Sequence, residues 1–148
     1  MSAAWCVFGD LNSIRRLGER KSVISNQVYR GETRRFNDFI EKSDLFNIPM
    51  VGRKFTWYKP NGLVKSIIDR IIVSREWLDR WPDSKKVVLG RSVSDHCTLV
   101  LKTSWIGDLN RLEVWIYGNL MAGLRTLFSV NGRAMRCMVV GFSSLRKN

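Results

Sequence analysis

The stretch that decides the fold is WCVFGDLN, at residues 5–12. Its first four residues are apolar, which predicts a buried strand, and Gly9, Asp10 and Asn12 lie at the end of that strand. Functional side chains are often carried by loops that a rigid scaffold positions. We therefore expect the carboxylate and the amide at the carboxyl end of this strand to contribute to a site.

A second polar group precedes another apolar run, far along the chain. Ser94, Asp95 and His96 come just before the run at 98–101, and His96 is the single histidine of the sequence. Imidazole titrates near neutral pH, and the neighbouring carboxylate could supply a metal ligand or a local negative charge. Taken alone, the triplet also fits a turn with a structural histidine. Together with residues 5–12 it favours phosphate chemistry.

Length, composition and charge bound the class of protein. A chain of 148 residues with 45% hydrophobic residues has the length of one domain and enough apolar side chains for a core. Lysine and arginine total 25 against 13 acidic residues, which gives a formal net charge of +12. This balance favours a polyanionic partner such as nucleic acid, but it specifies no mechanism.

The cysteines and the apolar runs bear on the compartment. Cys6, Cys97 and Cys137 are far apart and form no Cys-x-x-Cys pair, so neither a disulfide framework nor a zinc site is indicated. No apolar run approaches the length that crosses a bilayer, and the first residues lack the pattern of a secretory signal. We expect an intracellular protein with no membrane partner. A core-type strand so near Met1 is what a truncated domain would present.

A helix is predicted over residues 33–42. Phe36, Phe39 and Ile40 recur there at helical spacing with charged residues between them, and Thr33 is available as an N-terminal cap. Such an apolar stripe packs a helix against a sheet. We expect all three apolar side chains to lie in the core and the helix to carry no chemistry.

The remaining pattern predicts strands and one short helix between residue 45 and residue 102. The expected elements are a connector at 45–52, a strand at 54–58, a turn at 60–62, a strand at 66–73, a helix at 74–81, and strands at 86–89 and 97–102. Strands that alternate with helices indicate an α/β fold. Residues 103–148 show no sustained period, and we expect a weakly structured extension there.

Asp69 stands out within the predicted strand at 66–73. Strands disfavour aspartate, and a buried or half-buried carboxylate between isoleucines needs a partner. That partner could be Arg70 or another base in an ion pair, or it could be the imidazole of His96. The residues alone leave both alternatives open.

Four motifs in order carry a resemblance to a known family. They are GDLN at 9–12, FTW at 55–57, SIIDR at 66–70 and SDH at 94–96. The set resembles the endonuclease/exonuclease/phosphatase superfamily and, more narrowly, the apurinic-type endonuclease domain of plant LINE-type (non-LTR) retrotransposons. The resemblance covers roughly residues 4–102, within a partial domain at 1–102 that is followed by the extension at 103–148. It implies the carboxy-terminal half of a four-layer α/β/β/α sandwich (DNase I-like) with an irregular tail.

The resemblance implies a metal-dependent phosphodiester hydrolase that nicks DNA, with a role for each matching residue. Asp10 would orient or activate the attacking water, and Asn12 would help to hold the water and the scissile phosphate. His96 would hydrogen-bond the phosphate and stabilise developing charge, while Asp69 would fix the tautomer of its imidazole. Asp95 would lie at a site for Mg²⁺ or Mn²⁺.

The resemblance also implies a DNA-facing rim and a departure from the family pattern. The rim would contain Trp57, for which core packing is the alternative, and the basic residues Arg53, Lys54, Lys65 and Arg70. The family's chief metal-binding glutamate lies upstream of the GDLN motif, and no glutamate precedes Gly9 here. We therefore expect a weakly held metal and a truncated domain with reduced or lost cleavage.

Partners and alternatives follow from the same comparison of motifs. The resemblance implies DNA as the substrate, an ancestral fusion to a reverse transcriptase, and a nuclear location if the protein is functional. One alternative is a remnant that binds nucleic acid through its basic charge without catalysis. The other is a phosphatase branch of the same superfamily, acting on a small phosphorylated substrate.

Overall fold

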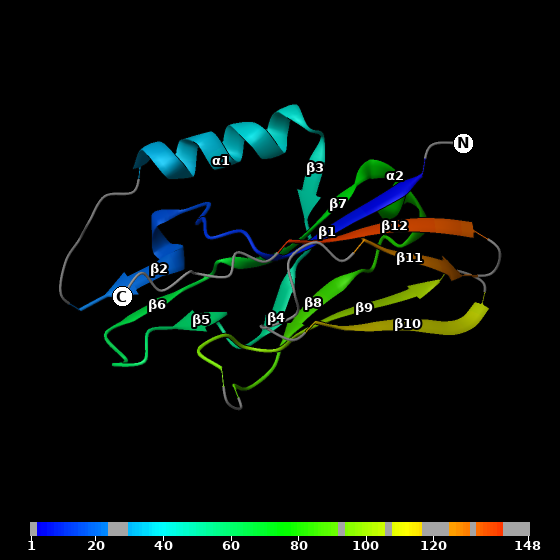
Figure 1. Ribbon diagram of the computed structural model, residues 1–148. Helices are drawn as coiled ribbons and strands as arrows, with labels where there is room; N and C mark the ends of the chain where they lie inside the picture. The colour runs from blue at the N-terminus through cyan, green and yellow to red at the C-terminus, as the bar shows by residue number, and fades with distance from the viewer. Residues whose placement is uncertain are drawn as a thin grey trace.

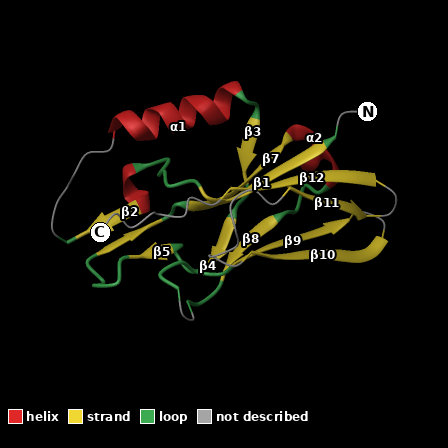
Figure 2. Ribbon diagram, viewed as in Figure 1, coloured by secondary structure: helices red, strands yellow, loops and turns green. Residues whose placement is uncertain are grey.

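A computed structural model describes residues 3–23, 30–91, 94–105, 108–116, 125–130 and 133–140 of the chain. These residues form a mixed α/β structure with three small sheets and few helices. In Figure 1 the longer helix, α1 (Arg30–Lys42), lies along one side of the molecule, and the two larger sheets follow it as successive layers. Strands account for most of the regular structure (Figure 2).

The first sheet contains the strand that residues 5–12 predict. Its five strands lie in the order β11 (Arg125–Val130), β12 (Arg133–Val140), β1 (Ala4–Asp10), β7 (Asp69–Ser74) and β3 (Leu45–Asn47). Strands β1 and β7 are antiparallel, and β12 lies parallel to β1 on its other side. All six residues of β7 are buried, which makes β7 the most enclosed strand among the described residues whose burial is known.

Two further sheets complete the architecture. The second sheet has the order β10 (Asp108–Ile116), β9 (Leu99–Trp105), β8 (Lys85–Val88) and β4 (Met50–Gly52). The third sheet has the order β2 (Arg20–Ser22), β6 (Val64–Ser66) and β5 (Trp57–Tyr58), and β5 and β6 form the hairpin expected around Gly62. The positive φ of Gly62, 75°, is a backbone conformation that glycine adopts without strain.

The main core lies between the first and second sheets. The first sheet contributes side chains that alternate along β1 and β7, and the second contributes the inward residues of β8 and β9. The members from these strands are Ala4, Cys6, Phe8, Ile71, Val73, Val88, Leu99 and Leu101. Asp10 and Asp69 continue the same alternation by two residues, so their side chains lie on the core face at its polar end.

The short helix α2 (Arg75–Arg80) closes one side of this core as expected. Trp77 and Trp81 are buried, with ring centroids 4.7 Å apart. Ser74 occupies the N-cap position, but its hydroxyl accepts a hydrogen bond from the backbone N–H of Trp5 and makes no capping bond. No helix within the described residues is long and apolar enough to cross a membrane.

The expected connector at 45–52 and the expected strand at 66–73 both differ from the structure. The connector forms the short strands β3 and β4, and the strand is broken at residues 67–68 into β6 and β7. At the break, the hydroxyl of Thr56 accepts the N–H groups of Ile68 and Asp69, each at 3.1 Å. This side chain replaces the strand partner, so the chain can leave the third sheet and enter the first.

Helix α1 corrects the expectation for residues 33–42. It begins at Arg30, so Thr33 lies inside the helix and is not its cap. Ile40 is 3% exposed and Phe36 is partly buried, but Phe39 is 53% exposed, so the prediction that Phe39 lies in the core is wrong. Phe36 and Ile40 are four residues apart and share a face, whereas Phe39 lies about 100° around the helix from Ile40.

The expectation of an irregular tail also differs from the described part of residues 103–148. Strand β9 continues through the expected boundary at residue 102, β10 pairs with β9, and β12 pairs with β1. The apolar and basic residues of β12 do not alternate, so the sequence gives no strand period there. Residues 117–124 and 141–148 lie outside the described residues.

The face of α1 can be tested with two neighbouring substitutions. We expect Ile40→Ala to lower the free energy of unfolding by about 2 to 5 kcal/mol, because it removes a buried side chain. Phe39→Ala should lower it by only about 1 kcal/mol, because about half of that side chain is already in water. Urea unfolding of the two variants measures both values. A larger loss of unfolding free energy from Phe39→Ala than from Ile40→Ala would contradict the position of the helix.

Candidate active site

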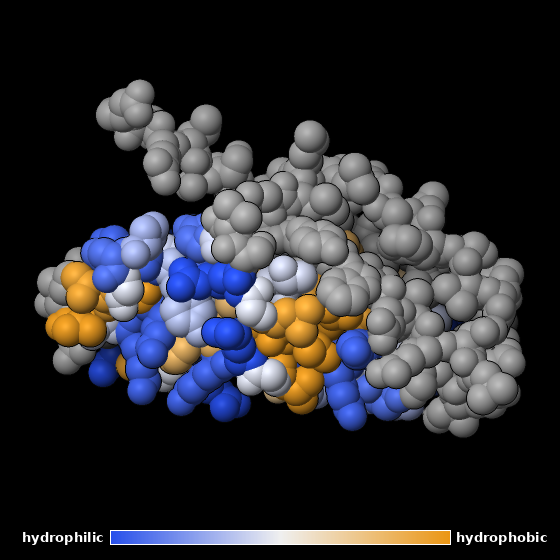
Figure 3. Space-filling model, turned by 90° about the horizontal axis from the view of Figure 1, so that it is seen from below, coloured by the Kyte–Doolittle hydropathy of each residue, from blue (hydrophilic) through white to orange (hydrophobic). Residues whose placement is uncertain are grey.

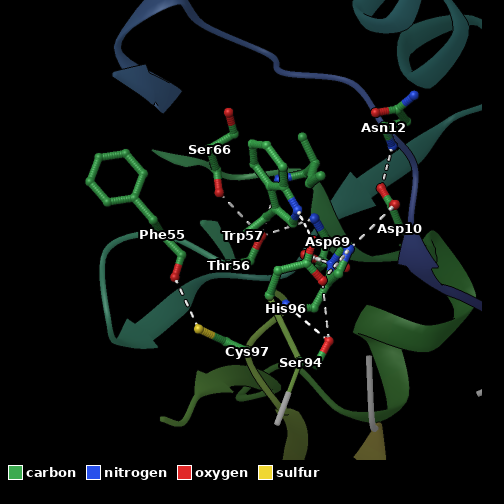
Figure 4. Close-up of polar contacts among 12 residues, drawn as sticks. Asp10, Asn12, Phe55, Thr56, Trp57, Ser66, Asp69, Ser94, His96 and Cys97 are labelled. Carbon is green, nitrogen blue, oxygen red and sulfur yellow. Dashed lines mark hydrogen bonds and ion pairs between the residues drawn. The ribbon is translucent and has the colours of Figure 1, made fainter. Parts of the chain in front are cut away.

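His96 and Asp69 form the centre of the site. The Nδ1 atom of His96 lies 3.0 Å from Oδ1 and 3.1 Å from Oδ2 of Asp69 (Figure 4). The contact with the imidazole, which the sequence left as one of two alternatives, is therefore the one observed. An Nδ1–H donated to Asp69 leaves Nε2 of the neutral ring as the acceptor.

The main chain of Asp69 is held from several directions. It lies opposite Asp10 in the β1–β7 pair, and its N–H donates to Thr56 as described above. Its carbonyl accepts a hydrogen bond from Nζ of Lys86, at 3.0 Å. We assigned no role to Thr56 or Lys86 from the sequence. The sequence did hold one indication for Lys86. It is two residues before Val88 in the predicted strand at 86–89, so both side chains lie on the same face of the strand, and that face is buried.

The loop that carries His96 is pinned to the third sheet by backbone hydrogen bonds. The backbone of His96 bridges to Trp57, the N–H of Tyr58 donates to the carbonyl of Asp95 at 2.9 Å, and the N–H of Cys97 donates to the carbonyl of Thr56 at 2.7 Å. The imidazole therefore reaches the ends of β1 and β7 from a fixed position. The site lies where the three sheets meet.

Two further carboxylates face the other side of the imidazole. One oxygen of Asp10 and one of Asp95 each lie 4.0 Å from Nε2 of His96. The Asp95 carboxylate also accepts a hydrogen bond from the indole N–H of Trp57 at 2.9 Å. The exposed fraction of the side chain is 14% for His96, 18% for Asp10 and 42% for Asp95, so the Nε2 side of the site reaches solvent.

These carboxylates raise the pKa of His96 above its ordinary value of 6.5. Burial alone lowers the pKa of the imidazole, because it disfavours the charged form. The hydrogen bond to Asp69 and the negative charges of Asp69, Asp10 and Asp95 act in the opposite direction and outweigh burial. The site therefore favours the imidazolium.

Asp10 is held in a less favourable electrostatic position. Burial raises its pKa, the backbone N–H of Asn12 lowers it through a 2.7 Å hydrogen bond, and the charge of Asp69 raises it again. The net effect raises the pKa of Asp10 above its ordinary value. A carboxylate whose charge is disfavoured accepts a proton more readily than an ordinary aspartate.

Asn12 differs in position from the other predicted site residues. It is exposed, with a positive φ of 49°, and its backbone N–H donates to Asp10. Figure 4 shows Asn12 on the side of Asp10 away from His96. The structure thus brings Asp10, Asp69, Asp95 and His96 together and places Asn12 at the margin of that group.

The donor set for a divalent metal is incomplete in the described residues. Mg²⁺ takes oxygen ligands in an octahedral arrangement, and Asp95 and Asp10 supply carboxylates of the required kind. No group of three or more His, Cys, Asp or Glu side chains among the described residues is arranged to hold a metal ion. These residues do not form a metal site by themselves.

Basic side chains lie near Trp57 and the hairpin β5–β6. Arg53 and Lys54 are exposed, and Lys65 is partly exposed, with Nζ of Lys54 and Lys65 at 5.9 and 5.1 Å from the centre of the Phe55 ring. Arg91, for which the sequence predicts no role, lies over the ring of Tyr58 at 4.7 Å. Figure 3 shows hydrophilic side chains on either side of a hydrophobic patch on the described part of one face.

Arg70 does not belong to the predicted DNA-facing rim. Its side chain is 1% exposed, and its guanidinium donates to the carboxylate of Glu19 and to the carbonyls of Ser13 and Ile67. A buried guanidinium needs such partners, because an unpaired buried charge is very costly. Arg70 instead ties the loop that follows Asp10 to the start of β7, and the prediction of a surface role is wrong.

Comparison with known proteins gives no family assignment, since no family model matches the chain and no curated protein matches it. The resemblance carried by the four motifs therefore stays a prediction.

Stability should depend on pH through His96. The folded-state pKa lies above the unfolded value of about 6.5, so the stabilising contribution is full below that value and is lost as pH rises through the folded pKa. We expect the free energy of unfolding in urea to fall as pH rises above about 6.5 and through the folded pKa of His96. His96→Gln should flatten this profile, and an equally steep profile in that variant would contradict the assignment.

Proposed function

We propose that the chain is a phosphodiester hydrolase, derived from a DNA-nicking endonuclease of a retrotransposon and reduced in activity. The proposal includes the DNase I-like sandwich as the parent fold. The observation that carries it is the convergence of Asp10, Asp69 and Asp95 on the one imidazole of the chain. These are residues of three separate motifs, in the relation that the resemblance implies for them.

The arrangement suits attack on a phosphodiester. Asp69 occupies Nδ1 of His96, and the 4.0 Å separations leave Nε2 beyond hydrogen-bond distance of Asp10 and Asp95. A phosphate oxygen could therefore take the Nε2–H of the imidazolium, which would stabilise the negative charge that develops during attack. Asp10, whose raised pKa favours proton uptake, would accept the proton of the attacking water.

Charge supports a nucleic acid as the substrate over a small phosphate ester. The formal net charge of +12 attracts polyanions, and Arg53, Lys54, Lys65 and Arg91 provide basic groups near Trp57. A Mg²⁺ or Mn²⁺ ion held weakly by Asp95 stays a prediction of the resemblance. So do the fusion to a reverse transcriptase and the nuclear location.

A second function is a nucleic-acid-binding remnant without catalysis. It is favoured by the same basic residues, because they lie on the hairpin and adjoining loops and require no chemistry at His96. Binding through such residues releases counterions from the nucleic acid, so affinity should fall steeply with salt concentration. The two functions differ in the consequence of removing the imidazole.

Plasmid nicking separates the two functions. We expect the wild-type chain to relax supercoiled plasmid slowly in Mg²⁺ or Mn²⁺. His96→Ala should lower the rate by about 10²- to 10³-fold, because it removes the hydrogen-bond donor to the phosphate, while binding to DNA stays nearly unchanged. Asp79→Ala, which removes an exposed carboxylate of α2, is the matched control and should nick like the wild type.

Three other outcomes are informative. Equal nicking by wild type and His96→Ala would rule out the role of the imidazole. Salt-sensitive binding without nicking by either protein would support the binding remnant. Hydrolysis of a small phosphate ester without DNA cleavage would point to the phosphatase branch.

A further inference from the structure

A lysine lies inside the core, behind the pair formed by Asp69 and His96. Lys86 is 1% exposed and alternates inward with Val88 on β8, in register with the buried Leu101 of β9. Lysine is almost never fully buried without a partner, because removing an ammonium group from water costs free energy. A methionine of similar length would fill this position without that cost, so packing alone does not explain the lysine.

The partner of Lys86 follows from the register of β1 and β7. The N–H of Leu11 donates to the carbonyl of Ile68, which makes Asp10 and Asp69 a non-hydrogen-bonded pair in the antiparallel ladder. The N–H and the C=O of Asp69 therefore both point away from β1. On that side β3 pairs with residues 72–74 of β7 and does not reach Asp69.

Two side chains take the place of the missing strand. Thr56 accepts the N–H of Asp69 at 3.1 Å, and Lys86 donates from Nζ to its carbonyl at 3.0 Å. Other charged groups act on the ammonium as well: burial and the charge of Arg70 lower the pKa of Lys86 to about 8, while Asp69 and Glu19 raise it. The ammonium is therefore mostly retained at neutral pH.

We propose that Lys86 is a positioning residue that fixes the main chain of Asp69, and thereby the tautomer and orientation of His96. It acts through Asp69 and touches neither the imidazole nor a substrate. The relevance of Lys86 to catalysis rests on the proposed function, but its effect on the imidazole does not. Each can therefore fail without the other.

The single histidine makes the test direct, because every imidazole signal in a nitrogen-15 NMR spectrum belongs to His96. Above the pKa of His96, the wild-type spectrum should show the neutral ring with its proton on Nδ1. In Lys86→Met we expect this preference to be lost, with the nitrogen shifts moving to the tautomer mixture of an exposed histidine. Lys85→Met, which removes the exposed neighbouring lysine, is the matched control and should leave the spectrum unchanged.

A folded Lys86→Met protein with the wild-type tautomer would overturn the proposal and leave Lys86 as a core residue only. Should that variant fail to fold, the wild-type chain gives a second measurement. The carbon-13 shift of the Lys86 Cε should then change at the pKa of His96, while that of Lys85 should not. A Lys86 signal that does not respond to the titration of His96 would also overturn the proposal. None of these spectra depends on DNA cleavage.

Discussion

The structure depends on the register in which β1 and β7 pair. That register places Asp10 opposite Asp69 in a non-hydrogen-bonded pair, in which side chains approach most closely. Two carboxylates directly opposite each other repel, and partial burial increases the cost. The imidazole of His96 offsets this cost by contacting Asp69 and facing Asp10. Retaining Asp10 and Asp69 as a pair at the polar end of the core lowers stability, and this is a cost that a functional site explains and packing alone does not.

The surrounding elements hold Asp10, Asp69 and His96 in place. Thr56 and Lys86 supply the hydrogen bonds that an adjacent strand would otherwise give to Asp69. The loop before β9 is fixed to β5 by backbone hydrogen bonds, so His96 enters from a rigid support. On the opposite side, the buried Arg70 pairs with the partly exposed Glu19 and anchors the loop that follows Asp10. The imidazole is thereby oriented before any ligand arrives.

Local pattern was sufficient for the elements that interact with near neighbours. The strand at residues 5–8, the turn at Gly62 and the short helix with Trp77 follow from apolar spacing and turn residues. The cost of burying a carboxylate predicts that Asp69 needs a partner, but the structure was required to show that this partner is His96 and not Arg70. Arg70, Phe39 and Lys86 could not be placed in this way. Whether a basic side chain or a ring reaches water depends on which distant element covers it. The strand at 133–140 could not be predicted for a different reason, because its apolar and polar residues do not alternate.

A double-mutant cycle tests the central claim, that the Asp69 carboxylate and the His96 imidazole interact directly. The free energy of unfolding is measured in urea at about pH 6 for the wild type, Asp69→Asn, His96→Gln and the double variant, where imidazole carries much of its charge. A coupling free energy of about 1 to 3 kcal/mol is expected for groups in contact. The same cycle with the exposed Asp38 in place of Asp69 should give a value near zero. A coupling near zero for Asp69 and His96 would contradict the account.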